Sequence, residues 1–109
     1  RIGNPASWPH AVDAADESGG SITAVTDRQI LAAFRLIARN GVFAELASTA
    51  SIAGLLAMHE AGTLPKGATI VCVLTGHGLK DPEWAIAGAG EPVIIPVDAD
   101  HAARVLGLA

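Results

Sequence analysis

The sequence is poor in cysteine and in aromatic residues. Its 109 residues include one cysteine, no tyrosine and only 4% aromatic residues. A lone Cys72 cannot close a disulfide within the chain, so we expect a small, reduced side chain packed in a strand. The four histidines lie on separate segments without ligand spacing, and no second cysteine accompanies them. These absences argue against a zinc site, and we predict no bound metal.

Charge and long apolar runs are also scarce. Charged residues make up 17% of the sequence and the net charge is −4, which leaves no basic surface for nucleic acid. There is no run of eighteen apolar residues and no leader pattern, so neither a membrane span nor a signal peptide is predicted. The length suits one domain with a single core. The composition is typical of a cytoplasmic globular protein without nucleic-acid or membrane partners.

The most informative segment that is present runs from 70 to 82, IVCVLTGHGLKDP. Residues 71–74 are continuously apolar, which favours a strand buried on both faces of an α/β sheet. Gly76 and Gly78 allow a ligand to approach the backbone closely. Ligands of open α/β sheets bind at the carboxyl ends of strands, where Thr75 lies. The segment therefore predicts a binding corner at Thr75, although a strand can also end in this way simply to turn.

The rest of the chain is predicted to alternate helices with short strands. Caps, glycine stops and apolar periodicity indicate the helices, and short apolar or alternating runs indicate the strands. Helices are expected at 4–17, 27–40, 48–61, 81–87 and 98–106, and strands at 21–25, 41–45, 70–74 and, as an edge strand, 92–97.

Four segments in the same order resemble the threonine synthase family, which belongs to the fold type II pyridoxal-phosphate enzymes. They are RIGNPASW, DESGG, GVFAELASTASIAGLL and TGHGLKDP, and together they cover nearly the whole chain. The resemblance implies an α/β fold, namely a portion of a three-layer open sheet with flanking helices. Since enzymes of this family are much longer, residues 1–109 are expected to be their C-terminal part, with the N-terminal remainder absent.

The resemblance also implies an activity. Enzymes of this family use pyridoxal 5'-phosphate to convert O-phospho-L-homoserine and water to L-threonine and phosphate, and a homodimer is expected of the whole enzyme. The Schiff-base lysine is expected in the missing part, because Lys66 and Lys80 both lie in polar turns and are predicted to be solvated. No catalytic residue is therefore expected in this chain, and the chain alone is expected to be inactive.

The cofactor-binding residues implied by the resemblance centre on Thr75, whose hydroxyl would meet the pyridine nitrogen. Weaker candidates are Ile2, Gly3, Glu45 and Gly76. The family places the matching glutamate on the cofactor side within an EPAS-like motif. The charge also permits a second interpretation, in which the Glu45 carboxylate is solvated or ion-paired.

Two residues near this corner leave questions open. Leu46 stands where the family usually has proline, which leaves open whether the turn after Glu45 has the family's backbone form. His77 either lines the entrance to the pocket or faces solvent.

Two other functions fit the sequence. One is another fold type II pyridoxal-phosphate lyase, such as a threonine or serine dehydratase. The other is a stand-alone domain that binds a partner or small ligand without catalysis.

Overall fold

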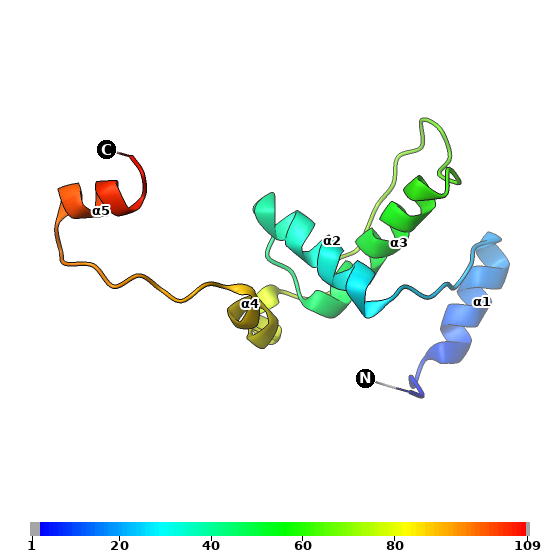
Figure 1. Ribbon diagram of the computed structural model, residues 1–109. Coiled ribbons are helices and arrows are strands. Elements are labelled where there is room, and N and C mark those ends of the chain that lie inside the picture. The colour runs from blue at the N-terminus through cyan, green and yellow to red at the C-terminus, as the bar shows by residue number, and fades with distance from the viewer. Residues whose placement is uncertain (1–2, 109) are drawn as a thin grey trace.

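The computed structural model describes residues 3–108, so Ile2 lies outside the described residues. The chain is helical and elongated, with helices strung along an open path (Figure 1). Its radius of gyration is 19.1 Å and its principal extents are 61 × 35 × 20 Å. A compact domain of about 100 residues has a radius of gyration of about 13 Å. The described chain therefore does not close around one large core.

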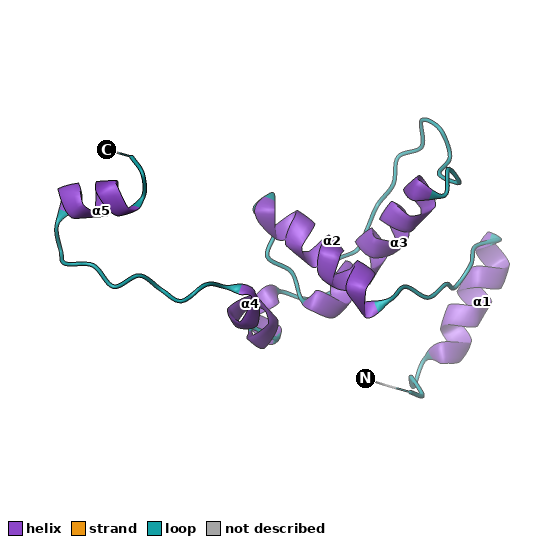
Figure 2. Cartoon of the chain, viewed as in Figure 1, coloured by secondary structure: helices purple, strands orange, loops and turns teal. Residues whose placement is uncertain are grey.

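Local sequence signals account for most of the helices. Figure 2 shows helices joined by loops. Gly19, with φ 65°, ends the first helix, and Thr26 caps the second. The predicted first helix starts later than expected, at Trp8 rather than near residue 4, with Pro9 tolerated in its first turn. The α-helices are α1 (Trp8–Ser18), α2 (Asp27–Arg39), α3 (Ala50–Glu60), α4 (Glu83–Gly88) and α5 (Ala99–Val105), and the 3-10 helices are η1 (Leu46–Thr49) and η2 (Gly78–Lys80).

Helix α2 has the most complete set of local signals. The Thr26 side chain accepts a hydrogen bond from the Gln29 amide, and the Gln29 side chain accepts one from the Thr26 amide. This capping box satisfies two amides that the first turn would otherwise leave without a partner. The helix buries Ala33 and Phe34 and ends before Gly41, whose φ of 84° is a conformation that favours glycine.

The small core lies where α2 packs against η1 and α3, at the centre of Figure 1. Its buried apolar side chains are Ala33, Phe34, Ala44 and Ala53. Thr49 is fully buried beside them, and its hydroxyl lies 2.7 Å from the Leu46 carbonyl oxygen and 3.2 Å from that of Ile30. Thr49 therefore joins η1 to α2 through hydrogen bonds as well as through packing.

The predicted strands are not formed within residues 3–108. Segments 21–25, 70–74 and 92–97 have no regular secondary structure, and 41–45 is reduced to one antiparallel bridge between Ala44 and His77. A strand exists only through hydrogen bonds to a neighbouring strand, and no described segment supplies that neighbour. The described residues therefore do not confirm the expected portion of a three-layer open sheet, although the residues predicted as strands are rich in strand-forming types.

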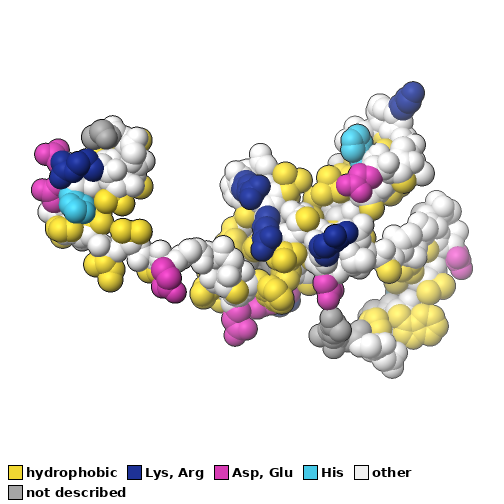
Figure 3. Space-filling model, viewed as in Figure 1, with side chains coloured by type: hydrophobic (Ala, Val, Ile, Leu, Met, Phe, Trp, Pro, Cys, Tyr) yellow, Lys and Arg dark blue, Asp and Glu magenta, His cyan; other side chains and the backbone are white. Residues whose placement is uncertain are grey.

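The predicted burial of residues 71–74 is wrong for the same reason. Val71 is 82% exposed and Val73 is 66% exposed, while Cys72 is half-buried. Hydrophobic side chains are spread over the whole face shown in Figure 3, including the arm that carries α5. Helix α1 contains no buried residue, and Ile94 is 96% exposed. The apolar positions that the sequence indicates as core thus lie mostly on the surface of the described chain.

Candidate functional site

The predicted binding corner is held against the segment that carries Glu45. The Glu45 amide donates to the Gly76 carbonyl at 2.8 Å, and the Gly78 amide donates to the Phe43 carbonyl at 3.2 Å. These two bonds flank the bridge between Ala44 and His77. Residues 43–48 and 75–81, far apart in sequence, therefore meet in one small unit that we call the clasp.

Neighbouring side chains approach the backbone of the two clasp glycines too closely for any other residue to fit there without a shift. A Cβ at Gly76 would collide with the Glu45 carboxylate and would lie 3.0 Å from the Glu45 Cβ. A Cβ at Gly78 would lie 2.5 to 2.6 Å from three atoms of the Phe43 ring. Neither glycine has a positive φ. The sequence signal at these positions therefore reflects space for a neighbouring side chain, which is one of the uses of glycine.

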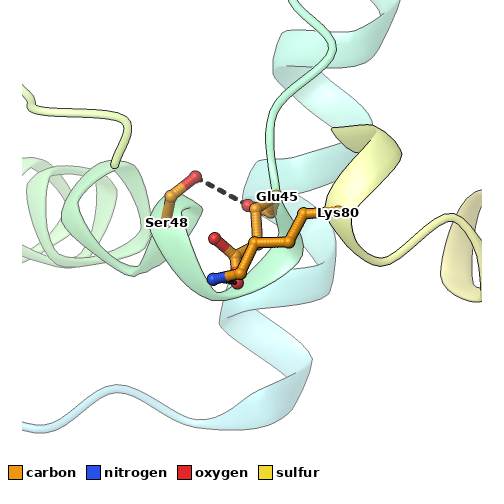
Figure 4. A network of polar contacts seen from close by, with 3 residues as sticks. All are labelled: Glu45, Ser48 and Lys80. Atoms are coloured by element: carbon orange, nitrogen blue, oxygen red, sulfur yellow. Dashed lines mark hydrogen bonds and ion pairs between the residues drawn. The ribbon is translucent and has the colours of Figure 1, made fainter. Parts of the chain in front are cut away.

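The carboxylate of Glu45 is ion-paired with Lys80. The Lys80 Nζ lies 2.8 Å from the Glu45 Oε1, and the Glu45 side chain is only 15% exposed, against 67% for Lys80 (Figure 4). The Ser48 hydroxyl donates to the Glu45 carbonyl at 2.7 Å and fixes the backbone there. The described residues thus show an ion-paired Glu45 carboxylate, and its place on the cofactor side stays a prediction. Lys80 is exposed as predicted, but sequence reasoning missed its partner because the two residues are 35 positions apart.

Leu46 does not distort the turn after Glu45. Glu45 has φ −59° and ψ 138°, and this extended ψ is also the one required of a residue that precedes proline. Leu46 begins η1, where an amide has no partner within the helix and proline is often found. The backbone at this turn therefore takes a form that either residue can adopt.

Thr75 lies at the edge of the clasp. It is exposed, and no hydrogen bond of its side chain is present among residues 3–108. Its C-terminal neighbour, Gly76, is fixed by the Glu45 amide. A hydroxyl in this setting is available to a ligand, while its position is limited by the backbone that follows it.

His77 faces largely outward and packs on the clasp. Its ring meets the Phe43 ring edge to face, with centroids 5.6 Å apart. The His77 Nδ1 accepts a hydrogen bond from the Leu79 amide at 3.1 Å, which caps η2. His77 therefore has a clear structural part in the turn.

The remaining residues named from the sequence lie apart from the clasp. Gly3 is exposed, with nothing within 4 Å of the place where a Cβ would stand. Lys66 is exposed in a turn. Within residues 3–108, no group of three or more side chains is placed to hold a metal ion, and no helix has both the length and the apolar character to cross a membrane.

Comparison with known proteins defines the class of this chain. The model of the pyridoxal-phosphate dependent enzyme family matches residues 1–76, more than half of the sequence. The chain therefore belongs to the family of pyridoxal-phosphate dependent enzymes.

Its relatives within that family include several threonine synthases. The chain is 57% identical to threonine synthase of Halalkalibacterium halodurans over 100 residues, which is 90% of this chain and 28% of that protein. It is 50% identical to threonine synthase of Mycobacterium leprae over 109 residues, 99% of this chain and 30% of that protein. It is 49% identical to threonine synthase of Methanocaldococcus jannaschii over 107 residues, which is 97% of this chain and 26% of that protein. The chain thus spans under a third of these relatives.

The described residues fit one side of a pyridoxal-phosphate site. Thr75 offers an exposed hydroxyl with no internal partner, a suitable hydrogen-bonding group for a pyridine nitrogen. The amine needed to hold the cofactor covalently has no good candidate, because Lys80 is ion-paired with Glu45 and Lys66 is exposed in a turn. The described residues therefore fit the pyridine ring of the cofactor, but they do not offer a lysine suited to its covalent attachment.

Proposed function

We propose that this chain is the C-terminal part of a threonine synthase, which converts O-phospho-L-homoserine and water to L-threonine and phosphate. The observation that carries the proposal is 50% identity to a threonine synthase over 99% of this chain. The clasp supports it, because the turn that contains Thr75 has a defined place in the structure. The chain alone is proposed to be inactive, since no residue among 3–108 supplies the covalent amine.

Thr75 is proposed to hold the pyridine nitrogen of the cofactor. When bound, pyridoxal phosphate stabilises the negative charge that develops on substrate carbons. The Thr75 hydroxyl is neutral, so it orients the ring through a hydrogen bond without keeping the nitrogen protonated as a buried carboxylate would. The proposed role of Thr75 is therefore to position the ring and to limit how strongly the ring withdraws electrons from the substrate.

Four further residues are proposed to lie near the cofactor. Gly76 would leave backbone beside the ring, and Ile2 and Gly3 would pack at its flank. Glu45 would contribute through its place in the clasp, where its carboxylate is already engaged by Lys80. We propose these positions because the resemblance to the family aligns them with the cofactor side.

The three-layer sheet is proposed for the whole enzyme. Segments 21–25, 70–74 and 92–97 would pair with strands that the rest of the enzyme contributes. The exposure of Val71, Val73 and Ile94 supports this arrangement. Their side chains would be buried in a sheet that is covered by helices on both faces. A cytoplasmic homodimer that binds a small-molecule substrate is proposed on the same resemblance, and light scattering of the whole enzyme would test the dimer.

Phosphate release tests the proposed function. The whole enzyme, loaded with pyridoxal phosphate, is expected to release phosphate from O-phospho-L-homoserine and to form L-threonine in equal amount. Threonine and serine should not be converted to ammonia and 2-oxo acids at a comparable rate. Efficient deamination without phosphate release would instead identify a dehydratase and end the proposal.

Replacement of Thr75 by valine tests its role. Valine keeps the volume and removes the hydroxyl, so kcat of the whole enzyme should fall by about tenfold or more, the worth of one hydrogen bond of about 1.4 kcal/mol in the transition state. The urea midpoint should stay unchanged, because no described residue bonds to the Thr75 hydroxyl. The matched Thr63→Val change, on an exposed loop, should leave turnover as it is. Unchanged turnover in Thr75→Val would remove Thr75 from the site.

A further inference from the structure

We propose that Lys80 is a positioning residue for the cofactor corner, and that it acts by holding the Glu45 carboxylate over Gly76. The inference rests on the proposed function only in taking Thr75 as a cofactor-binding residue. It adds a residue that carries no other role in the site and that touches neither substrate nor cofactor.

The clasp depends on few backbone bonds. Among residues 3–108, Ala44 and His77 form the single antiparallel bridge, with one hydrogen bond on each side of it. Even a complete isolated hairpin is marginally stable in water. Two backbone bonds alone therefore hold residues 75–78 weakly, and side chains must supply the rest of the stabilisation.

The Glu45 carboxylate supplies part of it by occupying the space above Gly76. A Cβ added to Gly76 would collide with the Glu45 Oε2, so that oxygen stands where a side chain of residue 76 would be. The other oxygen, Oε1, lies 2.8 Å from the Lys80 Nζ. One carboxylate thus contacts both ends of the turn that follows Thr75.

Lys80 keeps the carboxylate in this place. The Glu45 side chain is only 15% exposed, and a largely buried carboxylate without a partner turns toward water or toward another charge. Loss of the ammonium would therefore favour rotation of Glu45 away from Gly76. The Gly76 backbone would then lose its cover, and the adjoining Thr75 hydroxyl would occupy a wider range of positions.

The pair differs from an ordinary surface ion pair. Exposed pairs contribute little because water competes and both side chains lose freedom. In the clasp one partner is largely buried, its backbone is fixed by Ser48, and η2 holds Lys80 opposite it (Figure 4). The carboxylate thus has a defined location that the lysine determines, as expected of a positioning pair.

The test measures cofactor affinity in the whole enzyme with Lys80→Met and a matched Lys66→Met control. The dissociation constant for pyridoxal phosphate, followed by the visible absorption of the bound cofactor, should rise about tenfold in Lys80→Met, equivalent to 1.4 kcal/mol. Lys66 is exposed in a turn outside the clasp, so Lys66→Met should leave the constant unchanged. Lys80→Arg keeps the charge and should restore affinity to within about threefold of the wild-type value.

A double variant distinguishes positioning from general damage. If Lys80 acts through Glu45, the Glu45→Gln/Lys80→Met enzyme should bind the cofactor no more weakly than Lys80→Met. If Lys80→Met does not fold, Lys80→Arg and the double variant, which leaves no unpaired charge, still give the comparison. Equal constants for Lys80→Met and Lys66→Met, or additive losses near a hundredfold in the double variant, would overturn the inference. Absence of phosphate release by wild-type enzyme would instead count against the proposed function, since cofactor affinity is measured without substrate.

Discussion

Replacement of Thr49 by valine should destabilise the centre of the fold by about 1–2 kcal/mol. The Thr49 hydroxyl has one hydrogen, shared between the Leu46 carbonyl at 2.7 Å and the Ile30 carbonyl at 3.2 Å. Valine preserves the branched shape but cannot donate, so both part-buried carbonyls lose this partner. A net hydrogen bond is worth about 1 kcal/mol, and acceptors that are partly withdrawn from water add to the loss.

This magnitude depends on residues of the chain itself. Thr49 is 0% exposed within the described structure, so nothing that packs on the outside changes its environment. The effect should be largest on the contact between η1 and α2, which Thr49 joins. The clasp begins directly before η1 and should loosen with it.

The assay is urea unfolding of the whole enzyme, with Thr63→Val as the matched control. Thr63 also donates to a carbonyl, that of Met58 at 3.2 Å, but it is exposed, and water replaces the lost bond. With an m value of about 2 kcal/mol per molar urea, Thr49→Val should lower the midpoint by about 0.5–1 M and Thr63→Val by much less. Equal midpoints for the two variants would refute the claim that burial makes the Thr49 bond costly to lose.

Two other substitutions test the clasp and the capping box by urea unfolding. Gly78→Ala places a methyl 2.5 to 2.6 Å from the Phe43 ring and should cost about 1–3 kcal/mol. Gly88→Ala meets nothing within 4 Å and should cost much less, so similar midpoints for these two variants would contradict the close approach. Thr26→Ala removes the cap of α2 and should cost about 1 kcal/mol, whereas Thr26→Ser should retain most of the stability. A serine variant as unstable as the alanine variant would show that the hydroxyl is not the source of the stabilisation.

The helices were predictable because their signals are local. Thr26 caps α2, Gly19 ends α1 with φ 65°, and Asp98 accepts a hydrogen bond from the His101 amide at the start of α5. Each signal acts within four residues along the chain, where the sequence states directly which groups can meet. The starts were less certain, as α1 shows, because several residues near a proline can begin a helix.

The candidate site was predictable only in part. The motif at 75–82 predicted the turn and indicated Thr75 and Gly76 as candidate cofactor-binding residues. It also indicated that the glycines of the turn are structurally important. The role of Lys80 was not predictable, because its partner is 35 positions away and an exposed lysine in a loop is commonly solvated. No periodic pattern relates two such distant residues.

The amino-acid sequence alone is enough for the approximate positions of the helices, for the turn at Thr75 and for the membership in the pyridoxal-phosphate dependent enzyme family. Only the folded chain shows that Glu45 pairs with Lys80 and that Gly76 and Gly78 make room for neighbouring side chains. It also shows that segments 21–25, 70–74 and 92–97 have no strand partner within residues 3–108. The physical reason is the range of the interactions. Caps and turns form between neighbours in sequence, whereas a strand, an ion pair or a close approach needs a partner that only the folded chain brings near.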